Sequence, residues 1–159
     1  MICVLHGISI GIAIDIASAC DIRIASQSSE FSIKEVDIGI AADLGTLQRF
    51  PRIVANDSWT RELALTGRFF SADEALKHGF VSNVQESKDK ALEKAISLAK
   101  VIAVKSPVAV QGTKALLEYS RDHSVREGLA LCCCAHSCRA GVLEIVEFDI
   151  YASFGTIAR

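Results

Sequence analysis

The sequence lacks an excess of charge of either sign, because its 159 residues carry 17 Lys and Arg against 19 Asp and Glu. It also lacks a basic stripe interleaved with aromatic residues, which argues against a nucleic-acid partner. Asp15, Asp21 and Arg23 break the longest apolar runs well short of the roughly 20 residues of a membrane span. The length suits one domain, and these absences predict that it has no nucleic-acid partner and no membrane span.

Two kinds of address signal are missing as well. The start of the chain has no charged segment followed by a small-residue cleavage site, so we expect no secretory signal. The C-terminal Ile157-Ala158-Arg159 is not a peroxisomal address of the Ser-Lys-Leu type.

Cysteine, by contrast, is frequent: there are six, and four of them lie in one segment, at Cys132, Cys133, Cys134 and Cys138. Adjacent cysteines on a helix point in different directions, which makes a poor disulfide framework. Cys132 and His136 are four residues apart, so a zinc site is an alternative, but the Cys-x-x-Cys spacing of structural zinc sites is absent. We expect reduced thiols, no metal and no cofactor.

Strands are predicted early in the chain. Residues 2–5 form a short apolar segment typical of a buried strand, and residues 21–25 are predicted to form another strand, with Ile22 and Ile24 on one side. Isoleucine recurs at positions 8, 10, 12, 14 and 16, and this period of two favours a strand over residues 8–16.

Helices are predicted in the second half. Ser58 is expected to cap a helix that ends near Gly67, and Ser71 and Glu74 form a capping box. Apolar residues recur at helical spacing over residues 88–104. Further helices are predicted after Ser106-Pro107 and, from a second capping box, after Ser124. Early strands and late helices predict an α/β fold with a helical C-terminal part.

Several carboxylates lie in apolar surroundings. Glu35, Asp37 and Asp43 fall among apolar and small residues between positions 31 and 51, and Asp15 lies inside the isoleucine run. Desolvation raises the pKa of a carboxyl group, which is how proteins make acids and bases that work near neutral pH. The alternative is structural, since such an acid can cap a helix or pair with a nearby Lys or Arg.

Separate blocks of the sequence resemble a known family. Glu62-Leu63-Ala64-Leu65-Thr66-Gly67, Ser71-Ala72-Asp73-Glu74-Ala75 and Gly79-Phe80-Val81 resemble the second half of the enoyl-CoA hydratase/isomerase (crotonase) superfamily. The blocks at 34–37, 41–49, 105–111 and 119–125 are similar to its Δ3,5-Δ2,4-dienoyl-CoA isomerases. The resemblance runs from about Ile2 to Leu129.

This resemblance implies an architecture. We expect a partial crotonase-like spiral (ββα) fold in a single, truncated domain over residues 1–159, which lacks the N-terminal half of the family. Residues 1–85 would form the remaining spiral core, and residues 86–159 a helical C-terminal part that diverges from the family after about residue 130.

The resemblance also implies a reaction and three site residues. Members of the subfamily shift two double bonds along a fatty acyl-CoA in β-oxidation, converting 3,5-dienoyl-CoA to 2,4-dienoyl-CoA. By resemblance Asp43 is the base beside the thioester carbonyl, Glu35 the acid at the far end of the conjugated system, and Asp15 orients the site. Such an acid–base partner is worth roughly 10²–10⁴ in rate.

An oxyanion donor is implied by the same comparison. The family's glycine-rich turn matches residues 6–15, with Gly11 and then the N–H of Ile12 at the position that binds the thioester oxygen. One such donor is worth roughly 10²–10³ in rate. The resemblance makes this segment a turn entering a helix, and we follow it in preference to the strand that the periodicity favours.

Partners and location follow by resemblance too. We expect a fatty acyl-CoA thioester as ligand, a homo-oligomer or association with family subunits, and a mitochondrial or peroxisomal location. Two alternatives stay open: a non-catalytic truncated subunit that pairs with full-length family members, and an enoyl-CoA hydratase.

Overall fold

The computed structural model describes residues 1–137. They fall into two compact units, one of Met1–Val104 and one that begins at Lys105. The elements, in chain order, are β1 (Ile2–Leu5), β2 (Ile8–Ile10), α1 (Ile12–Ala19), β3 (Ile22–Ser26), β4 (Glu30–Ser32), the 3₁₀ helix η1 (Glu35–Ile38), α2 (Thr46–Val54), α3 (Asp57–Thr66), β5 (Phe70–Ser71), α4 (Ala72–Lys77), β6 (Asn83–Gln85), α5 (Lys88–Ala103), α6 (Pro107–Tyr119) and α7 (Val125–Ser137).

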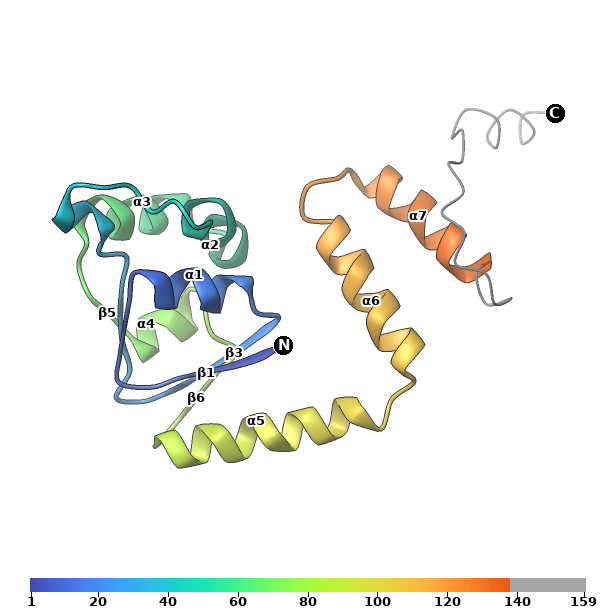
Figure 1. The fold of residues 1–159 in the computed structure, drawn as a ribbon, viewed down its shortest axis with the longest axis horizontal. Helices are drawn as coiled ribbons and strands as arrows, with labels where there is room; N and C mark the ends of the chain where they lie inside the picture. The colour runs from blue at the N-terminus through green and yellow to red at the C-terminus, as the bar shows by residue number, and fades with distance from the viewer. Residues whose placement is uncertain (138–159) are drawn as a thin grey trace. The chain divides into compact units, whose positions relative to one another are not determined.

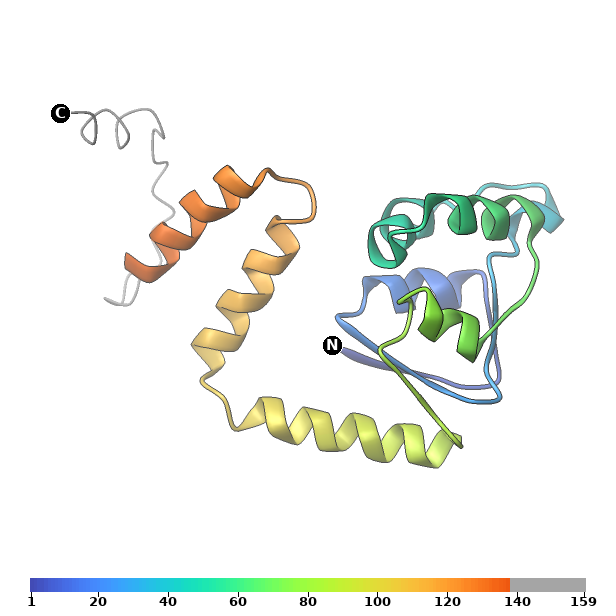
Figure 2. The same cartoon turned by 180° about the vertical axis from the view of Figure 1, so that it is seen from behind.

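Two small sheets organise the first unit. One has the strand order β1-β3-β6 with all pairs parallel, and the other has the order β2-β4-β5, in which only β5 is antiparallel. Parallel neighbours need crossover connections, and α1 supplies one between β1 and β3. Figures 1 and 2 show α1 on one side of the β1-β3-β6 sheet and α5 on the other. The predicted α/β class is confirmed.

The isoleucine run folds as strand and helix in succession. Strand β2 ends at Ile10, and Gly11 has a φ of 55°, a conformation that suits glycine and breaks the strand. Helix α1 begins at Ile12, with the N–H of Ile14 donating to the Gly11 carbonyl at 2.8 Å. The strand predicted from periodicity is therefore wrong beyond Ile10, and the turn into a helix implied by the resemblance is confirmed.

Helix starts are set by side-chain caps, and one prediction needs correcting. Asn56, and not Ser58, caps α3, since its side chain accepts the N–H of Trp59 at 3.0 Å and the helix starts at Asp57. An amide oxygen at this position satisfies one of the free N–H groups of the first turn. The capping boxes at Ser71 and Ser124 are confirmed.

The helices of the C-terminal part differ in how they pack. Helix α5, predicted over 88–104, buries Ala91 and Ala95 against β1 and β3 and so belongs to the first unit. In the second unit, which holds α6 and α7, no residue from 105 to 131 is buried. Of the predicted cysteine cluster, Cys138 and the side chains of Cys132–Cys134 lie outside what the structure describes.

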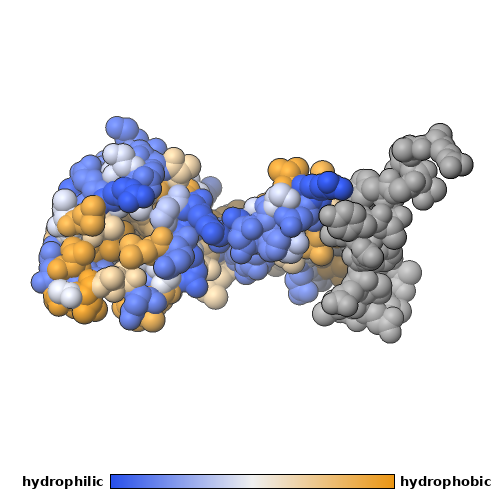
Figure 3. Space-filling model, turned by 90° about the horizontal axis from the view of Figure 1, so that it is seen from above, coloured by the Kyte–Doolittle hydropathy of each residue, from blue (hydrophilic) through white to orange (hydrophobic). Residues whose placement is uncertain are grey.

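Much apolar surface stays open, and Figure 3 shows hydrophobic patches on the first unit. Four of the five isoleucines of the run are exposed (Ile8, Ile10, Ile12 and Ile16), and only Ile14 is buried. Within residues 1–137, no single helix is long and apolar enough to cross a membrane. Only α5 and α6, counted together across the break between them, meet that test of length and composition.

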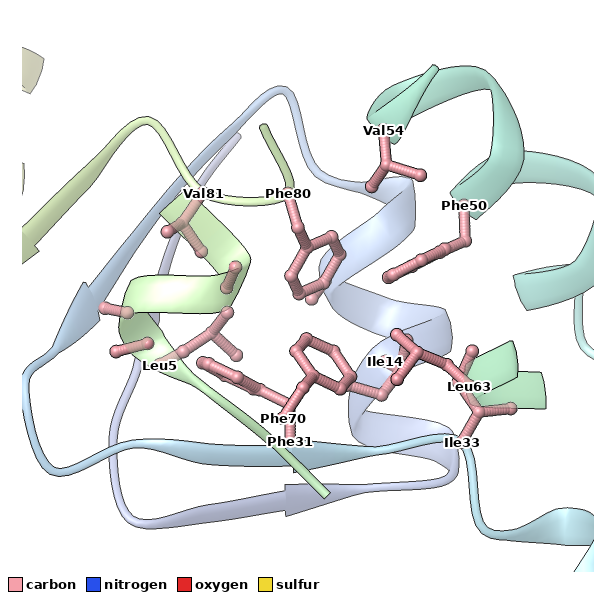
Figure 4. Close-up of a cluster of buried hydrophobic side chains, with 14 of the residues drawn as sticks. Leu5, Ile14, Phe31, Ile33, Phe50, Val54, Leu63, Phe70, Phe80 and Val81 are labelled. Carbon is pink, nitrogen blue, oxygen red and sulfur yellow. The ribbon is translucent and has the colours of Figure 1, made fainter. Parts of the chain in front are cut away.

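An aromatic cluster holds the first unit together. Phe31, Phe50, Phe70 and Phe80 are fully buried, and the ring centroids of Phe50 and Phe80 lie 4.9 Å apart. Figure 4 shows them gathered with Ile14 of α1 and Leu63 of α3. Burying such large side chains provides much of the stability of a small core. The cluster also fixes α1, α2 and α3 around β4; of the predicted acids, Asp15 lies on α1, and Glu35 and Asp43 lie between β4 and α2.

Candidate active site

A cavity of about 320 Å³ opens between η1, α2 and α3. Its wall is mostly apolar, as expected for a site that binds a hydrocarbon chain. The lining residues are Ile33, Glu35, Val36, Ala41, Ala42, Leu47, Pro51, Asp57, Thr60, Arg61, Ala64 and Leu65.

Glu35 is the predicted acid that faces this cavity. It is the first residue of η1 and is half-buried, and a Cβ placed on Gly11 would lie only 3.4 Å from its Oε1 atom. Its Oε2 atom is buried and has no hydrogen-bond partner among residues 1–137. Because a buried carboxylate oxygen without a partner is costly, this atom suits a carboxyl group that meets a ligand.

Asp15 lies deeper and is already engaged. It is 5% exposed in the middle of α1, and its Oδ1 accepts the backbone N–H of Thr46 at 2.7 Å. Thr46 is the first residue of α2, so the carboxylate lies at the positive end of that helix dipole. Asp15 therefore caps a helix, which was the structural alternative given for such an acid, and its hydrogen bond joins α1 to the start of α2.

Asp43 is placed differently from the other two acids. It lies in the segment between η1 and α2, directly after the cavity-lining Ala42, and its own side chain is exposed. The structure thus places Asp15 within α1 and Glu35 beside Gly11 at the start of that helix, and it leaves Asp43 open to solvent.

The predicted oxyanion donor occupies the first turn of α1. N–H groups at this position have no acceptor within the helix, which leaves the N–H of Ile12 available. The Ile12 side chain is 60% exposed. The N–H of Gly11 donates to the Ser32 carbonyl at 3.1 Å, so this turn is anchored to the end of β4.

Two cations of the first unit, Lys34 and Arg68, are held by other acids. Lys34 pairs with Asp37 at 2.8 Å, and Arg68 contacts Glu62 at 2.6 Å and Glu74 at 3.0 Å. The hydrogen bond from Arg68 lowers the pKa of Glu74 below its ordinary value. These contacts are structural, since none of them involves Asp15, Glu35 or Asp43.

Thr60 was missed by the sequence analysis. It is almost fully buried in the wall of the cavity, and its Oγ1 has no hydrogen-bond partner in the described part of the chain. A threonine inside an amphipathic helix gives no sequence signal of its own. The spacing of Thr60 one helical turn before Ala64, which also lines the cavity, is the one feature of the sequence that places both residues on the same face of α3.

Comparison with known proteins gives the family. The model of the enoyl-CoA hydratase/isomerase family matches residues 1–131. The mitochondrial Delta(3,5)-Delta(2,4)-dienoyl-CoA isomerase of Homo sapiens is 53% identical over 129 residues, which cover 81% of this chain and 39% of the relative. The peroxisomal enzyme of that name from Arabidopsis thaliana is 50% identical, with coverage of 81% and 46%.

A solved structure agrees. The enoyl-CoA hydratase of Bacillus anthracis superposes with a TM-score of 0.78 at 33% identity, over 82% of this chain and 50% of that one. The chain thus spans about half or less of the length of these relatives. The predicted crotonase-like, partial α/β fold is confirmed, and the chain belongs to the enoyl-CoA hydratase/isomerase family.

Proposed function

We propose that this site isomerises a 3,5-dienoyl-CoA to a 2,4-dienoyl-CoA. The observation that carries the proposal is Glu35, a carboxyl group with one buried, unpartnered oxygen among the described residues, in the wall of an apolar cavity. The identity to dienoyl-CoA isomerases, at 50% or more, supports this reaction over others of the family. The mitochondrial and peroxisomal relatives support a location in one of these organelles.

The chemistry assigns one step to each acid. Asp43 removes a proton from the carbon beside the thioester carbonyl, and the electron pair moves into the conjugated system as a dienolate. Glu35 delivers a proton to the far end of that system, so both double bonds shift by one carbon. The apolar cavity beside Glu35 suits the acyl chain, and the bound thioester would cover the exposed Asp43.

Charge on the thioester oxygen also needs a donor. The N–H of Ile12 fits, because the first turn of α1 leaves it free of intrahelical bonds. Asp15 acts through position in this proposal: its bond to Thr46 fixes α1, which carries the donor, against α2.

The test is a pair of isosteric substitutions. Asp43→Asn and Glu35→Gln should each lower the rate of conversion of 3,5-dienoyl-CoA by roughly 10²–10⁴. Asp89→Asn is the matched control, since Asp89 is an exposed acid in the first turn of α5, away from the cavity. Unchanged turnover in Asp43→Asn would overturn the assignment.

Hydration of an enoyl-CoA is the neighbouring reaction. It would require Asp15 and Glu35 to hold a water together, but the N–H of Thr46 already occupies Oδ1 of Asp15. Formation of 3-hydroxyacyl-CoA from a 2-enoyl-CoA, with no shift of a 3,5-diene, would favour the hydratase.

A second candidate function is association with full-length family subunits without catalysis. It is favoured by the exposed isoleucines of β2 and α1 and by the lack of any buried residue between 105 and 131. Co-elution with a full-length relative in size-exclusion chromatography is expected in that case. A well-behaved lone monomer that binds acyl-CoA would count against it.

A further inference from the structure

Residues 41–44, the segment that carries Asp43, have little backbone support. They form no helix or strand, and among residues 1–137 their backbone groups make no hydrogen bond to another backbone group. Ala42 anchors the start of the segment, because its side chain is buried in the core cluster. Asp43 and Leu44 after it are both exposed. The position of Asp43 therefore depends on what holds the end of the segment.

The side chain of Arg49 holds that end. Its Nη1 atom donates to the carbonyl oxygen of Leu44 at 3.0 Å. Within the described part of the chain, this is the one hydrogen bond made by any group of residues 41–44. The guanidinium thereby ties the residue that follows Asp43 to α2.

Gly45 makes room for this contact. Side chains on a helix point back toward its N-terminus, so Arg49 of α2 lies over Gly45, four residues earlier. A Cβ atom at position 45 would lie 2.8 Å from Cζ of Arg49 and closer still to Nη1. Gly45 also has a φ of 112°, a conformation that suits glycine. Both the backbone and the guanidinium therefore require the absence of a side chain here.

The charge of Arg49 makes this placement unusual. The N-terminus of a helix carries the positive end of its dipole, so cations are favoured at the other end. Arg49 nevertheless brings its guanidinium back over Gly45, the N-cap of α2. Departures from such local rules are expected at functional sites. The bond to Leu44, and not the helix, therefore accounts for where this side chain lies.

We infer that Arg49 is a positioning residue, which holds the Asp43 carboxylate beside the cavity by fixing the Leu44 carbonyl. The inference rests on the proposed function, in which Asp43 is the base. A base has to lie within hydrogen-bond reach of the proton that it removes, and a misplacement of about 1 Å can cost roughly 10²-fold in rate. Arg49 does not line the cavity, so it acts through Asp43.

The first arm of the experiment measures the mobility of the segment, by NMR relaxation of backbone N–H groups in the full chain. We expect an order parameter of about 0.85 for the Asp43 N–H in the unmodified chain and below about 0.6 in Arg49→Ala, the values of rigid and of flexible backbone. Lys100→Ala is the matched control, since Lys100 is an exposed cation in the last turn of α5. It should leave the Asp43 value unchanged, and circular dichroism confirms that each variant is folded.

The second arm measures turnover of a 3,5-dienoyl-CoA. Arg49→Ala should lower kcat by roughly 10–10² and leave KM unchanged, because the placement of the base matters in the transition state and not in substrate binding. Ethylguanidinium, which matches the part of the side chain that the substitution removes beyond Cβ, should restore part of the lost rate. Tetramethylammonium, a cation without N–H donors, should not.

Gly45→Ala tests the same contact from its other side. Its Cβ atom would displace the guanidinium while the charge stays in the chain. The substitution also strains a backbone with a φ of 112°, and this strain alone is measured by adding Gly45→Ala to Arg49→Ala. We expect Gly45→Ala to cost several-fold more in kcat in the unmodified chain than in the Arg49→Ala background, because the two residues are in contact.

The two arms separate this inference from the proposed reaction. Equal order parameters for Asp43 in the unmodified chain and in folded Arg49→Ala would overturn the inference, whatever the kinetics show. Unchanged kcat in Arg49→Ala, with an active unmodified chain, would overturn it as well. If the order parameter falls in Arg49→Ala but the folded unmodified chain has no turnover, the proposed reaction is wrong and the role of Arg49 in holding the segment stands.

Discussion

Replacing Asp15 by Ala tests whether this carboxylate contributes to the stability of the fold through its hydrogen bond to the N–H of Thr46. The substitution leaves the N–H of Thr46 buried without its acceptor at the start of α2. Hydrogen bonds to charged groups contribute about 1.5–3 kcal/mol, and a carboxylate at a helix N-terminus gains part of that from the helix dipole. We therefore expect Asp15→Ala to lower the free energy of unfolding by about 2–3 kcal/mol.

Urea denaturation measures this loss. With a slope of about 1.5 kcal/mol per M, the midpoint should fall by roughly 1–2 M. Asp15→Asn keeps an oxygen acceptor but loses the charge, so its loss should be about half as large. Asp43→Ala is the control: Asp43 is exposed, and its replacement should change stability by less than about 0.5 kcal/mol. Equal midpoints for Asp15→Ala and Asp43→Ala would refute this reasoning.

Three further predictions concern other parts of the chain. Phe50→Ala should cost about 3–5 kcal/mol in urea denaturation, because Phe50 is fully buried in the aromatic cluster; a loss below 1 kcal/mol would contradict that packing. The carbonyl oxygen of Tyr119 lies 2.9 Å from Nδ1 of His123, and this hydrogen bond raises the pKa of His123 above 6.5. The stabilisation that this bond gives the segment between α6 and α7 is therefore fully present below pH 6.5. It is lost as the pH rises through the raised pKa of His123 in the folded chain, and an NMR titration of the His123 ring should show that raised pKa. The hydrogen bond from Arg68 lowers the pKa of Glu74, so Arg68→Gln should raise that pKa toward 4.5. The stability that comes from the lowered pKa is present above pH 4.5 and is lost as the pH falls through the pKa of Glu74 in the folded chain. The stability of the unmodified chain, measured by circular dichroism during acid unfolding, should therefore change most between the pKa of Glu74 in the folded chain and 4.5.

Local signals in the sequence predicted most of the elements. The strands predicted at 2–5 and 21–25 match β1 and β3 within a residue, and the capping boxes at Ser71 and Ser124 start helices where expected. The wrong choice of Ser58 as the cap of α3 shows the limit of local signals. Asn and Ser are both favourable helix-capping residues, so the sequence alone does not decide between Asn56 and Ser58. The isoleucine run misled for a different reason: its period of two continues through Gly11, where the backbone turns.

The sequence predicts the candidate site as a set of residues and not as a geometry. The resemblance implies the acids Asp15, Glu35 and Asp43, but only the fold shows that Glu35 lines the cavity, that Asp15 holds a helix start and that Asp43 is exposed. Thr60 could not be found, because a buried hydroxyl in a helix looks like any surface threonine in sequence. Contacts between segments far apart in the chain decide all of these environments.

The most direct test of the acid–base account is the absorbance of the conjugated product. The folded chain is mixed with a 3,5-dienoyl-CoA, and the 2,4-dienoyl thioester is followed by its ultraviolet absorption. We expect the product to accumulate with the unmodified chain and to be suppressed by roughly 10²–10⁴ in Asp43→Asn. No product from folded protein that binds the acyl-CoA, or equal rates for the two proteins, would contradict the account.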